Sequence, residues 1–493
     1  MTWPKMPLSA VTTKVGSGAT PRGGKESYHE TGVPLIRSQN VRFEGFDRDG
    51  LAFLDSQQAR DLDGVIVQAN DVLLNITGAS IGRVTVAPED LAGARVNQHV
   101  CIVRPQANLL PRFLSHYLAS PNVQAFMMAE QSGVTRQALT KAKILDFEVP
   151  VPTVDTQQGI VAAIESHFSR LDAATATLER VQRNLERYRA SVLKAAVEGR
   201  LVPTEAELAK KEGRSYEPAS VLLKRILAER RRCWEEAELA KLKAKGKPPI
   251  DDRWKTKYEE PAAPDTDGLP ELPEGWCWTS LDALLREPLR NGHSARESKD
   301  GSGIRTLTLS AVTLGDFSAA NTKVTVALPD KVADLWLLPG DILVERSNTP
   351  ELVGLSALFR GPDQFAIFPD LMIRVRTTPR VDVEFIATLM RENRVRSCWR
   401  SQAQGIAGTM PKISQDVIAK TLVPLPPLPE QQRIVNELSA RLSSADAAAK
   451  NAALSDSRVR RLRQSILNWA FEGRLVRAAA EHPLFDAAVA GRR

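Results

Sequence analysis

A chain of 493 residues is too long for a single hydrophobic core, so three to five folded units are expected. Its composition, 43% hydrophobic and 25% charged, is typical of a globular protein, and the absence of any long apolar run argues against a membrane-spanning helix. The four cysteines are scattered without a Cys-x-x-Cys pair, which argues against disulfides and structural zinc. The net charge of +7 permits a nucleic-acid partner. Because the first residues lack the apolar core of a signal peptide, we expect a cytoplasmic protein.

Residues 1–150 are predicted to form a first globular domain, mixed α/β or mostly β. Short β-branched runs beginning at Val33, Asp71 and His99 are bounded by Gly, Pro, Asn and Asp, which is typical of strands. Residues 109–128 have helical spacing, and we expect them to form a helix against the sheet.

The next stretch, from Asp155 to Val202, occurs twice in the chain. Val149-Pro150-Val151-Pro152 matches Val423-Pro424-Leu425-Pro426 at an offset of 274 residues (423 − 149), and this offset continues without a gap to Val202 and Val476. A repeat of such length indicates two halves, each a globular part followed by a helix.

Residues 151–203, the first copy, are predicted to form a long helix with a coiled-coil seam. Asp155 followed by Gln158 resembles a capping box, and Gly199 suits a left-handed helix end. Apolar residues recur every seven positions, and a second set follows three residues after members of the first. The seven-residue set is Ile164, Leu171, Leu178, Leu185 and Val192, and the second set is Ala174, Val181, Tyr188 and Ala195.

Residues 425–477, the second copy, carry smaller side chains along the equivalent seam. The seam positions are Leu438, Ala445, Ala452, Val459 and Ile466, with Ala448, Leu462 and Trp469 beside them. Small residues facing bulky ones would let two helices approach closely, so we expect the two copies to pair with each other, preferably antiparallel.

A charge-rich insert, residues 204–268, lies between the halves. Residues 220–234 have the pattern of a basic amphipathic helix, followed by a Lys-rich segment. We interpret the insert as a solvated helix with a flexible linker. Contact with DNA or with a partner subunit is the alternative.

Residues 269–424 are predicted to form a second globular domain that echoes the first. Residues 339–344 match residues 69–74, and residues 409–413 lie 274 after residues 135–139. Between these anchors the two sequences diverge, which indicates one scaffold with two different surfaces. Residues 478–493 form a short tail rich in Ala and Arg.

The sequence contains no recognisable motif for catalysis or metal binding. Residues 18–26 lack a glycine and the hydroxyl residue that a phosphate-binding loop requires. The segment that begins at Asn348 lacks the second proline and the aromatic residue of the Asn-Pro-Pro-aromatic signature of methyltransferases that act on amino groups, and we interpret it as a turn. The six histidines show no metal-ligand spacing, and we interpret His99 as a residue at the end of a strand. We therefore predict no catalytic residue, no metal site and no cofactor bound by this chain.

Polar side chains suited to DNA recur at the expected loops. Asn and Gln pair with adenine, Arg and Lys with guanine, and hydroxyl or amide groups hold phosphates. The candidates in the first half are Thr20, Arg22, Lys25, Arg37, Gln39, Asn40, Asn75, Thr77, Asn97, Gln98, Thr135, Arg136 and Gln137. Those in the second half are Arg290, Asn291, His293, Arg296, Ser310, Arg346, Asn348, Arg400, Gln402, Thr409 and Lys412.

The chain resembles the specificity subunits of type I restriction–modification systems. The resemblance covers nearly the whole chain. The matching features are Gly18-Ala19-Thr20-Pro21, residues 36–41, residues 71–82, Val96-Asn97-Gln98-His99, the proline-rich helix entry at residues 424–435 and the helix exit at residues 472–476. The resemblance implies an α+β, mixed fold, in which two α/β target-recognition domains are separated by two long antiparallel coiled-coil helices in a pseudo-two-fold internal repeat.

The resemblance also implies a function. Each domain would read one half of a bipartite, asymmetric site in double-stranded DNA, and the chain itself would be non-catalytic. Two modification (methyltransferase) subunits would bring S-adenosylmethionine for adenine N6 methylation, and restriction (motor-nuclease) subunits would add ATP and Mg, all in a prokaryotic cytoplasm. A helix of about 44 residues spans roughly 65 Å, and half-sites one helical turn apart are about 34 Å between centres, so we expect the helices to set the gap.

Two other functions are compatible with the residues. A self-sufficient DNA methyltransferase would need a cofactor loop and a catalytic tetrapeptide, which the chain lacks. A helical scaffold whose domains bind other proteins would lack sequence-specific, salt-dependent retention of duplex DNA.

Overall fold

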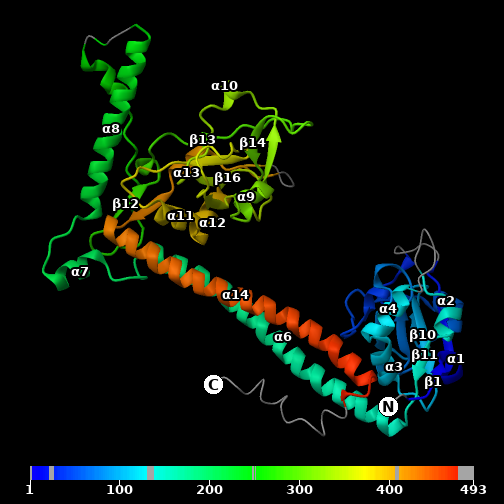
Figure 1. Ribbon diagram of the computed structural model, residues 1–493. Helices are drawn as coiled ribbons and strands as arrows, with labels where there is room; N and C mark the ends of the chain where they lie inside the picture. The colour runs from blue at the N-terminus through cyan, green and yellow to red at the C-terminus, as the bar shows by residue number, and fades with distance from the viewer. Residues whose placement is uncertain are drawn as a thin grey trace. The chain divides into compact units, whose positions relative to one another are not determined.

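The computed structural model describes residues 3–21, 27–129, 138–246, 249, 251–405 and 410–475. The chain divides into two compact units (Figure 1). The first unit comprises Met1–Val181 and Asn451–Arg493, and the second comprises Gln182–Lys450. The first unit therefore draws on both ends of the chain. Among the described helices, none is long and apolar enough to cross a membrane.

Two larger sheets form the framework of the first unit. A four-stranded antiparallel sheet has the order β2 (Thr12–Ser17), β10 (Val100–Pro105), β7 (Val72–Asn75), β8 (Val84–Val86). A three-stranded sheet has the order β6 (Ala52–Leu54), β3 (Val33–Ile36), β9 (Arg95–Val96), with β3 and β9 parallel. The remaining strands are β1 (Lys5–Pro7) with β11 (Glu148–Pro150), and β4 (Val41–Arg42) with β5 (Gly45–Phe46).

Short helices pack on these sheets. They are α1 (Leu8–Val11), α2 (Ser56–Asp61), α3 (Pro111–Leu118), α4 (Pro121–Ala129) and α5 (Lys141–Leu145). The three predicted strands are confirmed, at β3, β7 and β10. The single helix predicted over residues 109–128 is wrong, because the chain breaks between α3 and α4. Pro121 opens the second helix, where its missing N–H costs no hydrogen bond.

The second unit repeats the strand order of the first. Its four-stranded sheet runs β13 (Arg290–Asn291), β18 (Met372–Val375), β16 (Ile342–Glu345), β17 (Ser356–Leu358), which correspond in order to β2, β10, β7 and β8. The pair β12 (Cys277–Ser280) and β19 (Leu422–Leu425) corresponds to β1 and β11, and β14 (Ile304–Leu307) with β15 (Thr322–Thr325) corresponds to β3 and β6. Its short helices are α9 (Ser310–Thr313), α10 (Pro329–Val332), α11 (Val383–Arg391), α12 (Asn393–Ser401) and α13 (Gln415–Ala419). The internal repeat predicted from the sequence is confirmed.

Two helices of 44 residues each, α6 (Val154–Val197) and α14 (Leu428–Phe471), contribute to both units. In the first unit, Ile164 near the start of α6 shares a core with Ile466 near the end of α14. In the second unit, Val192 near the end of α6 shares a core with Leu438 near the start of α14. The pairing is antiparallel, as predicted.

The ends of the two helices are fixed by the same glycine turn. Gly199 and Gly473 adopt left-handed conformations, with φ of 68° and 73°. The next residue, Arg200 or Arg474, donates its backbone N–H to the carbonyl five residues earlier, at 2.9 and 2.8 Å. Both predicted helix stops are confirmed. The predicted start is wrong by two residues, because Thr153, whose hydroxyl accepts the N–H of Thr156, precedes the first helical residue.

The buried face of the helix pair follows the predicted seven-residue set in both copies, but most of the second set beside it is exposed. Ile164 and Val192 are buried as expected, but Val181, Tyr188 and Leu462 are each about 40% exposed (37%, 41% and 41%). Residues four positions after the seven-residue set, such as Phe168 and Ala196, pack into the cores instead. Both spacings lie on one helix face, and the sequence alone does not choose between them.

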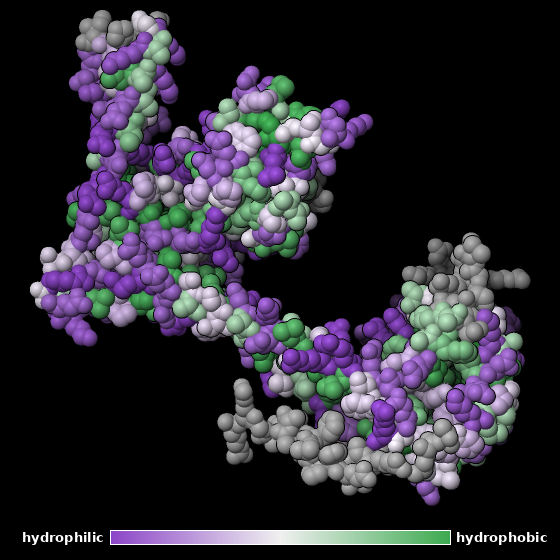
Figure 2. Space-filling view, viewed as in Figure 1, coloured by the Kyte–Doolittle hydropathy of each residue, from purple (hydrophilic) through white to green (hydrophobic). Residues whose placement is uncertain are grey.

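The insert between the halves is helical and belongs to the second unit. Its helices are α7 (Glu205–Glu212) and α8 (Ala219–Ala244). Leu222 and Ile226 of α8 lie in the same core as Trp276, while Arg230 contacts Asp282. The interpretation as a solvated helix with a flexible linker is therefore wrong for α7 and the first half of α8. Figure 2 shows mostly hydrophilic side chains on the visible face of α8.

Candidate nucleic-acid interface

One edge of the first unit gathers the ends of strands from both larger sheets. Strand β2 ends and β10 begins at the same edge, because Ser17 pairs with Cys101, and β7 ends there because Asn75 pairs with Val100. The parallel strands β3 and β9 also end there, since Asn97 donates its N–H to the Ile36 carbonyl at 3.1 Å. We call residues 18–20, 37–40, 75–77, 97–99 and 138 the first edge. Four groups of the predicted DNA-binding residues meet on it.

Side chains on the first edge form a continuous chain of polar contacts. The Thr20 hydroxyl donates to the Gln98 side-chain carbonyl, and the Gln98 amide nitrogen lies 3.1 Å from Nε2 of His99. The other ring nitrogen of His99 contacts the Thr77 hydroxyl. Gln98 is exposed, and the other three are half-buried. These groups can donate and accept hydrogen bonds at the surface, which is what recognition of base edges or phosphates requires.

Other predicted residues of the first edge contact the protein itself. Asn40, Asn75 and Asn97 are buried, at 0%, 0% and 4% exposure. The Asn40 amide donates to Asp47, that of Asn75 donates to the Ser38 carbonyl at 2.8 Å, and the Asn97 side-chain oxygen accepts the N–H of His99. These three asparagines therefore fix the loops.

Arg37 and Gln39 both reach the loop that carries Gly50. Each donates to the Gly50 carbonyl, and the Arg37 guanidinium also lies over the Tyr28 ring. Gln39 is exposed and Arg37 is half-buried. Five further candidates of the first half, and one of the second, lie outside the described residues: Arg22, Lys25, Thr135, Arg136, Gln137 and Thr409.

The second unit has an equivalent edge, and a matched backbone bridge identifies it. In the first unit Ala138 bridges Thr77, and the N–H of Leu139 donates to Ile76 at 2.9 Å. In the second unit Lys412 bridges Ser347, and the N–H of Ile413 donates to Arg346 at 2.8 Å. We call residues 291–293, 308–310, 345–348 and 412 the second edge. It lies at the ends of β13, β14 and β16, as the first edge lies at the ends of β2, β3 and β7.

The predicted residues on the second edge differ in exposure. Asn291 and Lys412 are exposed, and the Asn291 side-chain oxygen accepts a hydrogen bond from Gln415 at 3.0 Å. Ser310 contacts the hydroxyl of Thr308 at 2.7 Å, and His293 donates its N–H to Phe368. The remaining two are largely internal: Asn348 is 8% exposed, and the Arg346 Nε is buried with no acceptor among the described residues.

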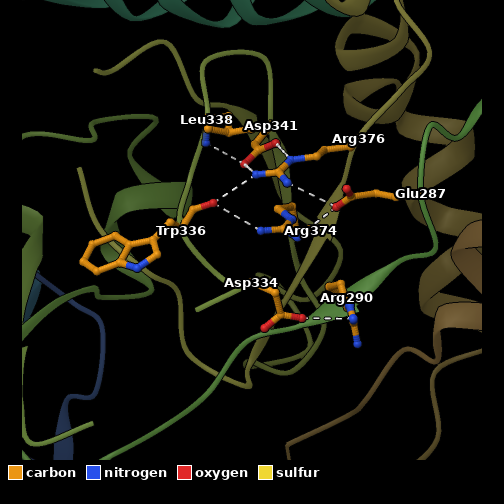
Figure 3. A network of polar contacts seen from close by, with 8 residues as sticks. All are labelled: Glu287, Arg290, Asp334, Trp336, Leu338, Asp341, Arg374 and Arg376. Carbon is orange, nitrogen blue, oxygen red and sulfur yellow. Dashed lines mark hydrogen bonds and ion pairs between the residues drawn. The ribbon is translucent and has the colours of Figure 1, made fainter. Parts of the chain in front are cut away.

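Four other predicted residues lie outside the second edge. Arg290 pairs with Asp334 at 3.0 Å (Figure 3), and the backbone carbonyl of Arg296 accepts a hydrogen bond from Val326 beyond β15. Arg400 and Gln402 are exposed at the end of α12, where Gln402 contacts Cys398. They come just before Gln404, which bridges Lys412.

A network that sequence reasoning missed supports the opposite end of the central strand. The Asp341 carboxylate accepts hydrogen bonds from Arg376 at 2.5 and 2.9 Å and from the Leu338 N–H at 2.9 Å, and Arg376 continues to Glu287 (Figure 3). The first unit has the same arrangement. Asp71 accepts from Arg104 at 2.7 and 2.8 Å and from the Gln68 N–H at 2.7 Å. The sequence signal that could have revealed this network is an Asp in both halves, directly after a residue that takes a left-handed conformation, Asn70 or Gly340.

Chemistry at the second edge includes a buried acid, Glu345, the last residue of β16. It is 0% exposed. Burial raises its pKa, and this effect is opposed by hydrogen bonds from Thr313 and Asn348 and by the charge of Arg396. No cluster of His, Cys, Asp or Glu that could hold a metal ion occurs in the described part of the chain.

Comparison with known proteins identifies relatives of the whole chain. Residues 3–184 match the family model described as the type I restriction modification DNA specificity domain. The chain is 22% identical to the type I restriction enzyme EcoKI specificity subunit of Escherichia coli (strain K12), over 98% of this chain and 91% of that protein. It is also 22% identical to the StySPI specificity subunit of Salmonella potsdam, with the same coverage.

Solved structures show the same fold. The HsdS subunit from Thermoanaerobacter tengcongensis superposes with a TM-score of 0.52 at 17% identity, covering 96% of this chain and 97% of that one. A chain solved in work on complex assembly and conformational transition of the type I R-M system gives a TM-score of 0.60 at 18% identity, covering 96% and 98%. Along nearly its full length, the chain is therefore similar in sequence and fold to the specificity subunits of type I restriction–modification systems, and residues 3–184 match the DNA specificity domain of these subunits.

Proposed function

We propose that this chain is the non-catalytic DNA-reading subunit of a type I restriction–modification complex, and that the first and second edges each read one half of a bipartite DNA site. The matched bridges, Thr77 with Ala138 and Ser347 with Lys412, carry this proposal. They show that the two units build the same edge on the same strands. The side chains on the two edges differ, as two different half-sites require.

Exposed polar groups on each edge suit DNA. Gln98 on the first edge and Asn291 on the second are exposed amides, the side-chain type that pairs bidentately with adenine. Lys412 adds a positive charge that can contact a phosphate. The predicted residues with internal contacts, such as Asn40 and Asn97, hold these loops in place.

The long helices are proposed to dock two modification subunits. The exposed apolar residues Val181, Leu454 and Leu462 of the first unit, and Tyr188 of the second, lie on α6 and α14. Exposed apolar side chains on a helix pair offer surface that a partner helix can bury. The modification subunits would supply S-adenosylmethionine, and restriction subunits would supply ATP and Mg-dependent chemistry.

Mapping of methylated motifs tests the reading function. The chain is expressed with its modification subunits, and the modified sequence is determined for the native chain, for Gln98→Ala and for Asn291→Ala. Each substitution is expected to relax one or more bases in a single half-site, with a loss of discrimination of roughly tenfold for one lost base contact. The two variants should affect opposite halves.

Gln57→Ala is the matched control, because Gln57 is an exposed amide on α2 whose side chain contacts Asp61, away from the first edge. It should leave the motif unchanged. Methylation by the purified chain without partners would favour a self-sufficient methyltransferase. Retention of duplex DNA without any sequence preference would favour a scaffold.

A further inference from the structure

The last residue of the central strand occupies the same place in both units but differs in chemistry. Asn75 ends β7 and Glu345 ends β16, and each lies four residues after the buried Asp that pairs with an arginine. Both side chains are 0% exposed. The first unit therefore has an amide where the second has an acid.

Each of these side chains reaches the segment that follows the first strand of the neighbouring sheet. The Asn75 amide donates to the Ser38 carbonyl at 2.8 Å, just after β3. One oxygen of Glu345 accepts the Thr313 hydroxyl at 2.6 Å, on α9, which follows β14. In both units the contact fixes a segment of the edge to the central strand.

Glu345 makes a second contact that Asn75 lacks. Its other oxygen accepts a hydrogen bond from the Asn348 amide, and the Asn348 side-chain oxygen accepts the N–H of Thr349 at 2.8 Å. An ionised carboxylate accepts at both oxygens, whereas a protonated acid or an amide presents a donor on one side. The ionised form accepts from Thr313 and Asn348 together in two charge-assisted hydrogen bonds, whereas beside a neutral acid or an amide the Thr313 hydroxyl has to donate to the Leu309 carbonyl, 3.2 Å away, instead.

We infer that Glu345 is a positioning residue for recognition of the second half-site, acting through Thr313 on α9 and Asn348 on the following turn. This inference rests on the proposed reading function. Because α9 begins at Ser310 and the turn carries Arg346 and Asn348, loss of the contacts moves both segments of the second edge. In the first unit the equivalent contact, between Asn75 and the Ser38 carbonyl, is made by an amide and does not depend on an acid.

The groups around Glu345 predict how recognition responds to pH. Thr313 faces it from α9, Asn348 from the turn, and Arg396 from α12, whose guanidinium also contacts the carbonyls of Glu351 and Val353. Burial raises the pKa of Glu345 above its ordinary value. DNA phosphates near the edge favour the neutral form further. Lowering the pH therefore protonates Glu345 and weakens recognition by the second edge.

The test uses the full chain in complex with its modification subunits and three duplexes: the mapped site, the site with its first half scrambled and the site with its second half scrambled. Binding is measured between about pH 8 and about pH 5. Because each edge also carries a histidine, His99 or His293, the comparison is made at the second half-site: discrimination by the native complex should fall more steeply as the pH is lowered than discrimination by Glu345→Gln. At about pH 8, Glu345→Gln should lower second half-site discrimination by about tenfold.

Thr313→Val is a second variant, since it removes one donor and leaves the acid in place. It should also weaken discrimination at the second half-site alone. Glu384→Gln is the control, because Glu384 is an acid of the same unit whose ion pair with Arg360 lies on the exposed start of α11. It should leave both half-sites unchanged.

Equal losses at both half-sites, or unchanged discrimination in Glu345→Gln and Thr313→Val, would overturn the inference. A native complex that discriminates at neither half-site would instead refute the reading function itself. Thermal unfolding separates the positioning role from a loss of folding. A merely structural defect would lower the melting temperature, but the folded fraction would keep the native dependence of second half-site discrimination on pH.

Discussion

The carboxylate of Asp71 accepts two hydrogen bonds from the guanidinium of Arg104, at 2.7 and 2.8 Å, and Asp71 is 0% exposed. The equivalent pair in the second unit is Asp341 with Arg376. Asp71→Asn is expected to destabilise the first unit by about 2 kcal/mol, because the arginine loses a charged partner in a buried site. Chemical denaturation measures the change. Asp90→Asn is the control, since its ion pair with Arg48 has similar geometry on the exposed surface and should contribute little.

Gln157 and Gln431, 274 residues apart, fasten the start of each long helix to its own unit. The Gln157 side chain accepts the N–H of Leu110 at 2.8 Å and donates to the Pro152 carbonyl at 2.9 Å. Gln431 accepts the N–H of Asp382 and donates to Pro426, both at 2.8 Å.

Substitution of either glutamine by Ala should cost about 1–3 kcal/mol, because the partly buried backbone N–H of Leu110 or Asp382 is left without its acceptor. Thermal and chemical denaturation would show the loss. Gln158→Ala and Gln432→Ala are matched controls, since these neighbours are exposed. Equal losses of stability in the buried and exposed substitutions would show that the hydrogen bonds of Gln157 and Gln431 do not stabilise the fold.

His116 predicts a pH dependence of stability in the first unit. Burial lowers the pKa of His116 to about 4 from its ordinary 6.5, with the nearby Glu165 carboxylate opposing the shift. The folded state therefore binds fewer protons than the unfolded state between these values, and stability falls as the pH drops from about 6.5 to about 4. His116→Gln should flatten this part of the stability profile measured by denaturation. A native profile that is already flat there would contradict the prediction.

The length of α6 is expected to set the number of unread base pairs. A seven-residue insertion near Leu178, with a matching insertion in α14, lengthens the helices by about 10 Å. The unread gap should then grow by about three base pairs while each half-site stays the same. Methylation-motif mapping measures the gap, and an unchanged gap would refute this use of the helices. Insertion of seven residues into the exposed end of α8 is the control.

The sequence predicted features that depend on local or repeated patterns. The helices, their Gly199 and Gly473 ends and the strands at Val33, Val72 and Val100 follow from periodicity and from residues with restricted backbone conformations. The duplication also allowed the pairing of the two helices to be predicted, because bulky positions in one copy matched small positions in the other; the antiparallel direction was a preference that this match did not decide.

What the sequence could not predict depends on contacts between distant residues. Asn75 and Gln98 are both polar residues at strand ends, but one is buried and the other exposed. Arg290 was a DNA candidate by type, yet its partner Asp334 lies 44 positions later (334 − 290). The amphipathic pattern of residues 220–234 indicated an apolar helix face, but not that Leu222 and Ile226 on it would join the core of the second unit.

The core of the first unit contains residues from both ends of the chain, and this has a consequence for synthesis on the ribosome. Phe113 and Ile160 share this core with Leu467 and Ala470, and the Phe113 and Phe471 rings meet at 5.3 Å. The second unit, Gln182–Lys450, is complete before residue 451 is made. The first unit is therefore translated first but completes its core last. Until residues 451–475 have been made, part of its apolar core stays exposed, and during that time the nascent chain is prone to aggregate unless a chaperone covers this surface.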